Sequence, residues 1–333
     1  SYKLEKLDES QGWNPQQGTM FYRNPHQPNN QFFFNDRDPK TGVVITVLYD
    51  IKKHKRIKTY QYSNHSFGNS GVCPTGKYFL AINYARMARL RPVTGYKETF
   101  DWTEGEAAPK EDGIAIINIK SGEKKILISF EQMAQGLNSN GFDVKNRNLF
   151  INHTLWSRDG KWIYFFVRAG WKSDKDGREG LNAACSVKVD GSQFIAGHQH
   201  IGGHPEWFRG TQIIGSKNNQ QVVYDILQRK VVGILGSPEI FPNPGGDISL
   251  SPNGIWLING YNNKSGSNFY SILNLKSGAW VRTPSFDTGF YKKDLRIDPA
   301  PRWNHESNQV LVSGLDVNGT RQLFIISINS KSI

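Results

Sequence analysis

A strand–turn–strand unit recurs six times along this chain of 333 residues. Each copy has a short strand with a bulky residue, a polar turn that often contains Gly, and a run of β-branched and aromatic residues. The clearest copies span residues 153–166 and 247–258, and successive copies start 43 to 53 residues apart, with one longer interval of 83. The weaker copies begin near Gly18, Ser70, His204 and Ala300. A second hairpin follows each copy, and a repeat of this length with four strands is typical of a β-propeller.

The sequence therefore predicts an all-β fold, a single β-propeller domain over residues 1–333 built from four-stranded blades, of which six can be counted. The segment Tyr2–Leu7 alternates like a strand with no hairpin before it, whereas Arg321–Ile328 resembles a third strand that lacks its fourth. We expect the N-terminal strand to complete the last blade and close the ring, because closure removes an exposed sheet edge.

The longest interruption of the repeat covers residues 84–112. It interleaves three arginines with aromatic and apolar residues, and loops this long in a compact fold are commonly functional or disordered. This composition favours an ordered loop, in which Tyr84, Arg86 and Arg91 are candidate site residues. A second insertion, residues 130–136, is predicted to form a short helix.

The net charge of +12 favours a polyanionic partner. Nucleic-acid-binding signatures are absent from the sequence, and so is an apolar run long enough to cross a bilayer. We therefore expect a monomer that binds an acidic polysaccharide or oligosaccharide rather than nucleic acid or membrane. The chain starts at Ser1 without a signal-like segment, and we expect a secreted or periplasmic protein whose targeting peptide, if present, has been removed.

Histidines supply the first candidate chemistry. Asn152 and His153 stand at the head of an inner strand, where His153 acts either as a base, acid or ligand, or as a hydrogen-bonded residue of the hub. His198, His200 and His204 lie within seven residues, a spacing compatible with a metal site. His204 also begins the next inner strand and is a candidate site residue without any metal.

Arginines and amides supply the second candidate chemistry, the binding of an acidic sugar. Arg168 and Arg296 are suited to bidentate recognition of a carboxylate or sulfate, whereas Arg302 beside Trp303 favours a stacking or ion-pair role. Uncharged amides and mixed polar residues near blade tops suit sugar hydroxyl groups, although they are also common in turns. The candidates of this kind are Gln17, Asn35, Arg37 and Asn152.

The acidic candidates Asp36, Asp247 and Asp298 lie in different blades, and no pair of carboxylates for glycoside hydrolysis can be identified from the sequence. The sequence contains no nucleophile elbow, phosphate-binding glycine loop or zincin motif.

Several motifs follow one another in a fixed order along nearly the whole chain. They are Gln16-Gln17-Gly18, Asn35-Asp36-Arg37, Asn83-Tyr84-Ala85-Arg86 with Leu90-Arg91-Pro92 and Gly95-Tyr96, Ile151-Asn152-His153, Arg296 with Asp298, Pro301-Arg302-Trp303, and Arg321-Gln322-Leu323. In this order they resemble the oligogalacturonate-lyase-like β-propellers, and similar propellers include lyases that cleave ulvan and rhamnose–glucuronate linkages.

The resemblance implies a seven-bladed fold, a uronate-containing substrate and, in oligogalacturonate lyase itself, a metal site. Relatives have His at the positions of Asp247 and Ala300, and these imidazoles contribute to that metal site. The resemblance thus leaves two cofactor predictions, none or a divalent metal, and Arg296 can supply positive charge in its place.

We predict a lyase that cleaves a uronic-acid-containing glycan by β-elimination. Arg168 or Arg296 neutralises the uronate carboxylate, His153 or His204 is the base, and Tyr84 is the acid, while Asp247 binds substrate. The alternatives are a glycoside hydrolase acting on a rhamnose–glucuronate type of linkage, and a non-catalytic propeller that binds polyanions or carbohydrate.

Overall fold

The computed structural model describes residues 5–171, 177–263, 266–289, 291–292 and 295–329. The chain groups into two compact units, Ser1–His198 and Gln199–Ile333, which we call the N-terminal and C-terminal units. The prediction of one domain over 1–333 stays a prediction, and each unit is described by itself.

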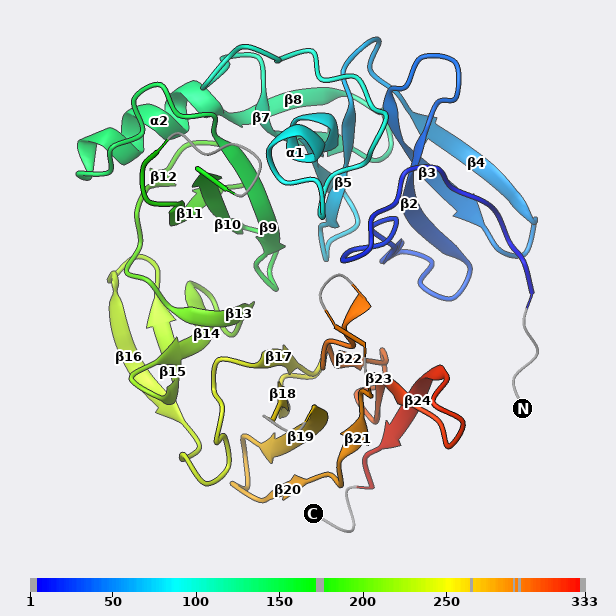
Figure 1. Cartoon of the computed structure of the whole chain (residues 1–333), viewed down its shortest axis with the longest axis vertical. Coiled ribbons are helices and arrows are strands. Elements are labelled where there is room, and N and C mark those ends of the chain that lie inside the picture. Colours follow the sequence, from blue (N-terminus) through cyan, green and yellow to red (C-terminus); the bar gives the residue numbers. More distant parts are fainter. Residues whose placement is uncertain (1–4, 172–176, 264–265, 290, 293–294, 330–333) are drawn as a thin grey trace. The chain divides into compact units, whose positions relative to one another are not determined.

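Three antiparallel sheets of four strands make up the N-terminal unit, each in simple up-and-down order (Figure 1). The first contains β1 (Tyr22–Arg23), β2 (Gln31–Arg37), β3 (Val44–Asp50) and β4 (Lys55–Tyr60). The second contains β5 (Phe67–Val72), β6 (Tyr78–Asn83), β7 (Gly113–Asn118) and β8 (Lys124–Ser129). The third contains β9 (Phe150–Trp156), β10 (Trp162–Ala169), β11 (Leu181–Lys188) and β12 (Phe194–Ile195).

Apolar side chains between these sheets form the cores of the unit. Phe33 of the first sheet and Phe79 of the second are fully buried in one cluster, and Leu80 and Phe165 belong to a larger one that reaches the third sheet. Strands β3 and β10 are buried on both faces because neighbouring blades cover a blade on two sides, and their β-branched and aromatic residues pack well on pleated surfaces.

Side-chain hydrogen bonds join the innermost strands of the second and third sheets. Thr154 Oγ1 on β9 donates to the carbonyl of Ser70 on β5 at 2.8 Å, and Trp156 Nε1 donates to the carbonyl of Gly71 at 2.8 Å. These bonds satisfy backbone acceptors that strand pairing leaves open, and they fix β9 beside β5.

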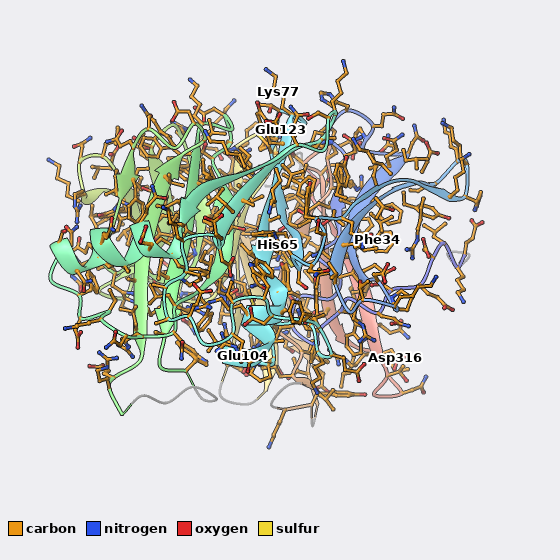
Figure 2. The ribbon with its side chains drawn as sticks, turned by 90° about the horizontal axis from the view of Figure 1, so that it is seen from above. Phe34, His65, Lys77, Glu104, Glu123 and Asp316 are labelled. Carbon is orange, nitrogen blue, oxygen red and sulfur yellow. The ribbon has the colours of Figure 1, made fainter. Side chains whose placement is uncertain are left out.

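The insertion predicted at residues 84–112 lies between β6 and β7 and opens with helix α1 (Tyr84–Leu90). Asn83 caps this helix by accepting from the Arg86 amide. Figure 2 shows Glu104 of the insertion at one end of the second sheet and Lys77 and Glu123, in its hairpin turns, at the other. An ordered loop is therefore confirmed.

Helix α2 (Phe130–Ser139) confirms the second predicted insertion. Its capping box pairs the Ser129 side chain with the Gln132 amide and the Gln132 side chain with the Ser129 amide. Cys73 and Cys185 are buried free thiols.

The predicted closing strand is not seen in its described part, residues 5–7, which form no strand. The Leu7 carbonyl accepts from the Tyr49 hydroxyl at 2.8 Å, and Asp8 pairs with Arg56. This segment therefore packs on the first sheet, and residues 1–4 lie outside the described part of the chain.

The C-terminal unit contains one sheet of nine strands and one of three, which we describe as three blades, two in the larger sheet and one in the smaller. The first has β13 (Gly202–Trp207), β14 (Gln212–Lys217), β15 (Gln220–Asp225) and β16 (Lys230–Leu235). The second has β17 (Asp247–Leu250), β18 (Trp256–Asn262), β19 (Ser267–Asn274) and β20 (Trp280–Arg282), with β21 (Phe286–Asp287) also paired to β19. The third has β22 (Arg302–Trp303), β23 (Gln309–Leu315) and β24 (Arg321–Ser327).

Apolar layers again fill the space between these blades. Ile214 and Leu257 join one cluster between the first and second blades, and Trp256 and Val312 join another between the second and third. Trp303 Nε1 donates to the Ser249 carbonyl on β17 at 3.1 Å, which repeats the link that Trp156 makes in the N-terminal unit. The fold is therefore that of an all-β propeller, and the number of blades stays a prediction. Within the described residues no helix is both long and apolar enough to span a bilayer.

Candidate functional site

The heads of two inner strands in the C-terminal unit meet at a histidine and a carboxylate. His204 on β13 and Asp247 on β17 form the parallel bridge between their strands, and His204 Nδ1 is paired with Asp247 Oδ1. The His204 side chain is 61% exposed and that of Asp247 only 16%. The carboxylate therefore holds an imidazole that a ligand can reach.

A pair of glycines precedes each member of this dyad, Gly202-Gly203 before His204 and Gly245-Gly246 before Asp247. Gly203 has a φ of +78°, and a Cβ atom on it would lie 3.3 Å from the backbone of Gly245. A Cβ atom on Gly246 would lie 2.2 Å from the carbonyl of Gly260. The glycines thus allow backbones to approach closely enough for the dyad to form.

The environment raises the pKa of His204 above its ordinary value. The main cause is the hydrogen bond to Asp247, and the negative charges of Asp247 and Asp298 act in the same direction. Burial and the positive charge of Arg302 act against them. Because Nδ1 donates to Asp247, the basic nitrogen of the neutral ring is Nε2.

Arg302 brings a positive charge to the same place. It opens β22, whose next residue, Trp303, is bonded to β17. Its side chain is exposed and donates to the Pro301 carbonyl at 3.2 Å, and no carboxylate of the described residues forms an ion pair with it. Arg302 is therefore available to bind an anionic group.

Arg296, the arginine that the sequence favoured, lies in the segment before β22. Its Nε donates to Asp298 Oδ1 at 2.7 Å, and both side chains are about half exposed. A neighbouring carboxylate offsets its charge, so Arg302 suits a substrate carboxylate better than Arg296 does.

Gly260 positions this segment against the dyad. It pairs with Asp247 across the sheet, and a Cβ atom on it would lie 2.3 Å from the Pro299 carbonyl and 2.9 Å from the Tyr270 ring. Only the absence of a side chain lets the segment before Arg302 approach β17 and β18 this closely.

A groove of ≈ 370 Å³ lies next to the dyad. We call it the Lys217 groove; its lining residues are His200, Gly202, Ser216, Lys217, Asn218, Asn219, Asn243, Pro244 and Gly245. Gly202 and Gly245 each stand two residues before a member of the dyad, so the groove lies close to His204 and Asp247 along the chain.

A second group of predicted site residues lies in the N-terminal unit, around His153. This residue has a φ of +59° at a register shift between β9 and β10, a conformation that is uncommon for residues other than glycine. Its ring meets the Phe166 ring edge-on, with centroids 6.2 Å apart. Bulges of this kind re-aim side chains and occur beside active sites.

Arg168 contacts the same phenylalanine. Its guanidinium carbon lies 5.4 Å from the Phe166 centroid and 5.0 Å from the Trp171 centroid, and its Nε donates to Asn182 at 2.8 Å. Burial, together with the charge of Arg91, lowers the pKa of Arg168 to about 10. The structure thus brings His153 and Arg168 to one aromatic ring.

Asn152 and Gln17 also meet here. Gln17 Nε2 lies 3.4 Å from Asn152 Oδ1, which also accepts from the His153 amide at 3.0 Å. In the described part of the chain, Asn152 Nδ2 and Gln17 Oε1 are buried without a hydrogen-bond partner.

Asn35 and Arg37 make mainly structural contacts. Asn35 is fully buried, and its side chain bonds the Asn69 backbone and the Tyr96 hydroxyl. Arg37 donates to the carbonyl of Glu98 and pairs with its carboxylate at 3.0 Å. We therefore revise the prediction that these two residues bind substrate.

The role predicted for Tyr84 is also revised. Its side chain is buried, stacks on Tyr96 with centroids 4.4 Å apart, and donates to the Asn69 carbonyl at 3.2 Å. Burial raises the pKa of Tyr84 well above its ordinary value. A hydroxyl in this position is a packing group rather than a proton donor to a glycan.

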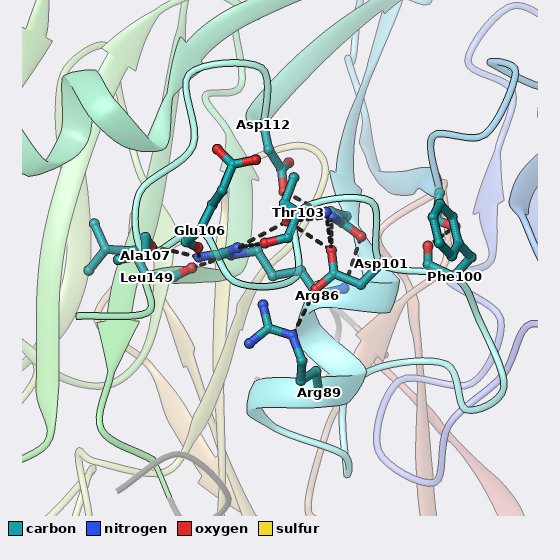
Figure 3. Close-up of polar contacts among 11 residues, drawn as sticks. Arg86, Arg89, Phe100, Asp101, Thr103, Glu106, Ala107, Asp112 and Leu149 are labelled. Atoms are coloured by element: carbon teal, nitrogen blue, oxygen red, sulfur yellow. Dashed lines mark hydrogen bonds and ion pairs between the residues drawn. The ribbon is translucent and has the colours of Figure 1, made fainter. Parts of the chain in front are cut away.

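Arg86 anchors the insertion instead of binding substrate (Figure 3). It is fully buried and donates to the carbonyls of Leu149 at 2.6 Å, Glu106 at 2.9 Å and Ala107 at 2.6 Å, and to Thr103 Oγ1 at 3.0 Å. Every nitrogen of the guanidinium is occupied, so none is left for a ligand.

Arg91 lies 5.1 Å above the Trp171 ring, close enough to Arg168 for the two charges to interact. This placement keeps Arg91 with the His153 group, and its role in substrate binding stays a prediction.

The three predicted histidine metal ligands do not form a metal site. His198 is buried, with Nε2 bonded to Ser186 Oγ at 2.8 Å and its ring stacked on Tyr164, whereas His200 lines the groove and His204 pairs with Asp247. Among the described residues, no group of three or more His, Cys, Asp or Glu side chains is arranged to hold a metal ion.

Sequence reasoning missed two features of this site. Arg302 was assigned to the hub because it precedes a tryptophan, and Lys217 was not singled out because its groove forms from separate turns. The matching glycine pairs before His204 and Asp247 are a usable signal for the groove, whereas the sequence has no such signal for Arg302.

Comparison with known proteins supports the fold alone. No protein-family model matches the chain, and no curated protein matches it either. Among solved structures, an oligogalacturonate lyase in complex with manganese aligns with a TM-score of 0.61 and 14% identity, over 98% of this chain and 80% of that one. The resemblance drawn from the motifs is therefore supported at the level of fold.

Other similar structures have different activities. A prolyl endopeptidase aligns with a TM-score of 0.55 and 12% identity over 94% of this chain and 40% of that one. The hydrazine synthase of Kuenenia stuttgartiensis aligns with a TM-score of 0.50 and 12% identity over 99% of this chain and 80% of that one. Because one fold carries such different chemistry, function has to be argued from the site.

Proposed function

We propose that this protein is a lyase that cleaves a uronate-containing glycan by β-elimination. The observation that carries the proposal is the dyad of His204 and Asp247 with Arg302 beside it at the heads of adjacent inner strands. Two further features support it: the similarity in fold to an oligogalacturonate lyase, and a net charge of +12, which suits an acidic substrate.

In the proposed reaction, Arg302 binds the uronate carboxylate and offsets the charge that builds up when the C5 proton leaves. His204 Nε2 takes that proton, and Asp247 stabilises the imidazolium that results. The electron pair of the C5–H bond forms the C4–C5 double bond, and the C4–O bond breaks. The imidazolium then returns the proton to the leaving oxygen, so that all atoms are accounted for.

His204 is a better base than His153 on structural grounds. Asp247 orients its ring and raises its pKa, and the cation needed for the carboxylate belongs to the same unit. The Arg168 guanidinium of the His153 group is instead buried between Phe166 and Trp171. The His153 group takes no part in the proposed steps, and its role stays a prediction.

A metal is not part of the proposed steps. The oligogalacturonate lyase of similar fold was solved with manganese, whereas here His204 and Asp247 supply two donors and Arg302 adds a repelling charge. These residues do not fit a resident divalent cation.

The test is the ultraviolet absorbance of an unsaturated uronate, followed while the protein is incubated with a panel of acidic glycans, with and without a chelator. We expect the absorbance to rise on at least one glycan and to be unaffected by the chelator. New reducing ends without absorbance would indicate hydrolysis, and binding without either product would indicate a non-catalytic propeller.

Asp247→Asn is expected to move the acidic limb of the kcat/KM profile to lower pH. The limb reports the protonation of His204 in the free enzyme, and Asp247 is the main cause of its raised pKa. In the wild-type protein the midpoint should lie above 6.5, the ordinary value. A profile that does not move would show that His204 is not the titrating base.

Arg302→Gln is expected to move the same limb in the opposite direction, to higher pH, because Arg302 lowers the pKa of His204. It should also reduce kcat/KM by about 10²-fold through the loss of charge stabilisation. Arg321→Gln, which removes an exposed arginine from β24, is the matched control. Equal effects of the two substitutions would contradict a specific role for Arg302.

A further inference from the structure

We propose that the Lys217 groove is a subsite for the acidic group of a second sugar residue, next to the one that is cleaved. The proposal rests on the proposed function, since it assigns the groove to the same glycan chain. It makes Lys217 a residue that determines specificity for runs of acidic sugars, where a carboxylate or a sulfate would be the bound group.

The charge of the groove supports an anionic ligand. Lys217 is half-buried and His200 exposed, and none of the nine lining residues is acidic. Within the described residues, Lys217 has no ion pair with a carboxylate of the protein. A half-buried ammonium group that is not offset attracts an anion more strongly than a fully solvated one does.

The remaining polar groups suit sugar hydroxyls. Asn218 and Asn219 form the turn between β14 and β15 with φ values of +50° and +57°, a conformation that asparagine tolerates better than most residues. Their exposed amides each offer donors and an acceptor at the rim of the groove.

Two glycines keep the floor of the groove open, because they have no side chain to fill it. A Cβ atom on Gly202 would lie 2.8 Å from Ser216 Oγ, and one on Gly245 would lie 3.7 Å from the same oxygen and 3.5 Å from Asn243 Oδ1. The two glycines therefore leave this hydroxyl and this amide uncovered within the groove.

The position of the groove links it to the dyad. Gly202 and Gly245 line it, each two residues before a member of the dyad, and two residues of chain span at most about 7 Å. A glycan bound at His204 and Arg302 would thus extend directly into the groove. The acidic group that Lys217 contacts belongs to a neighbouring sugar and not to the one that loses its C5 proton.

The experiment is isothermal calorimetry of the whole protein with two acidic oligosaccharides, one with adjacent acidic residues and one in which acidic and neutral residues alternate. Lys217→Gln should weaken binding of the first about tenfold, the effect of losing one charge-assisted contact, and leave the second within about twofold. Rising salt should reduce the difference between wild type and variant.

Lys230→Gln is the matched control, because Lys230 is an exposed lysine at the opposite end of the same blade, at the start of β16. Equal losses of affinity in the two variants would overturn the subsite, because the net positive charge of the protein would then explain the binding. If Lys217→Gln selectively loses binding of the oligosaccharide with adjacent acidic residues, but no unsaturated product forms, the subsite is upheld and the lyase activity is ruled out. Product formation with unchanged binding in Lys217→Gln would uphold the lyase and remove the subsite.

Discussion

His204→Gln is expected to lower kcat on the acidic glycan by about 10²–10⁴-fold, the usual contribution of a positioned general base. Glutamine keeps a polar side chain beside Asp247 but cannot take the proton at neutral pH. The substrate Kd should change by less than about threefold, because Arg302 and the groove remain in place. Stopped ultraviolet assays for turnover and calorimetry for binding measure the two effects separately.

His305→Gln serves as the control, since His305 is an exposed histidine of the same unit in the turn before β23. It should retain wild-type turnover. His153→Ala tests the alternative base directly, and we expect it to retain most of the turnover. If His153→Ala abolishes the product and His204→Gln does not, the base belongs to the N-terminal unit and the role given to the dyad is wrong.

Arg86→Met is expected to destabilise the protein by about 3–5 kcal/mol, among the largest effects of any single substitution. The change leaves the carbonyls of Glu106, Ala107 and Leu149 without the donor that the buried guanidinium supplies. It also removes the cation above the Phe130 ring, 4.9 Å from its centroid. Chemical denaturation at neutral pH measures the loss.

The destabilisation should depend on pH. Burial raises the pKa of Asp112 to about 6, and the positive charge of Arg86 is one of the influences that hold it down. Without Arg86 this pKa rises further, so ionising Asp112 in the folded state costs more. The difference between variant and wild type should therefore be larger above pH 6 than near pH 5, where Asp112 is largely protonated in both.

Arg89→Met is the matched control on the same helix. Arg89 is partly exposed and donates to Asp101 at 2.9 Å (Figure 3), and Asp101 keeps its hydrogen bonds to Asn83 and Thr103 without it, so the loss should be smaller than for Arg86→Met. Similar losses for the two substitutions would contradict the view that Arg86 anchors the insertion.

The fold could be predicted because its signal is repeated. Each blade carries the same alternation of bulky, polar and β-branched residues, so errors in one copy are corrected by the others. It is harder to predict that the last blade has three strands and that Leu7 packs on the first sheet. Both depend on which surface a terminal segment contacts.

The site could be predicted only where a residue opens an inner strand. Asp247 opens β17 and His204 lies two residues after the start of β13, whereas His153 lies inside β9. Tyr84 and Arg86 were misjudged because arginine and tyrosine in a long loop serve equally well to bind sugars and to anchor backbone carbonyls. Composition cannot distinguish these uses, whereas burial and hydrogen bonds can.

The groove could not be predicted at all. It forms where the turn after Lys217 lies beside the segment Asn243–Gly245, and these positions have no fixed spacing in the sequence. His198, His200 and His204 show the opposite case, because residues close in sequence predict one ligand set that the fold separates. His198 is hydrogen-bonded in the interior, His200 lines the groove, and His204 pairs with Asp247.

The most direct test of the lyase is cleavage of the active glycan in heavy-oxygen water, followed by mass spectrometry of both new chain ends. β-Elimination breaks the C4–O bond without adding water, so we predict that neither product contains the heavy oxygen at the cleaved bond and that one product carries a double bond. Incorporation of one heavy oxygen atom per cleavage would show that the bond is hydrolysed, and would contradict the account given for His204, Asp247 and Arg302.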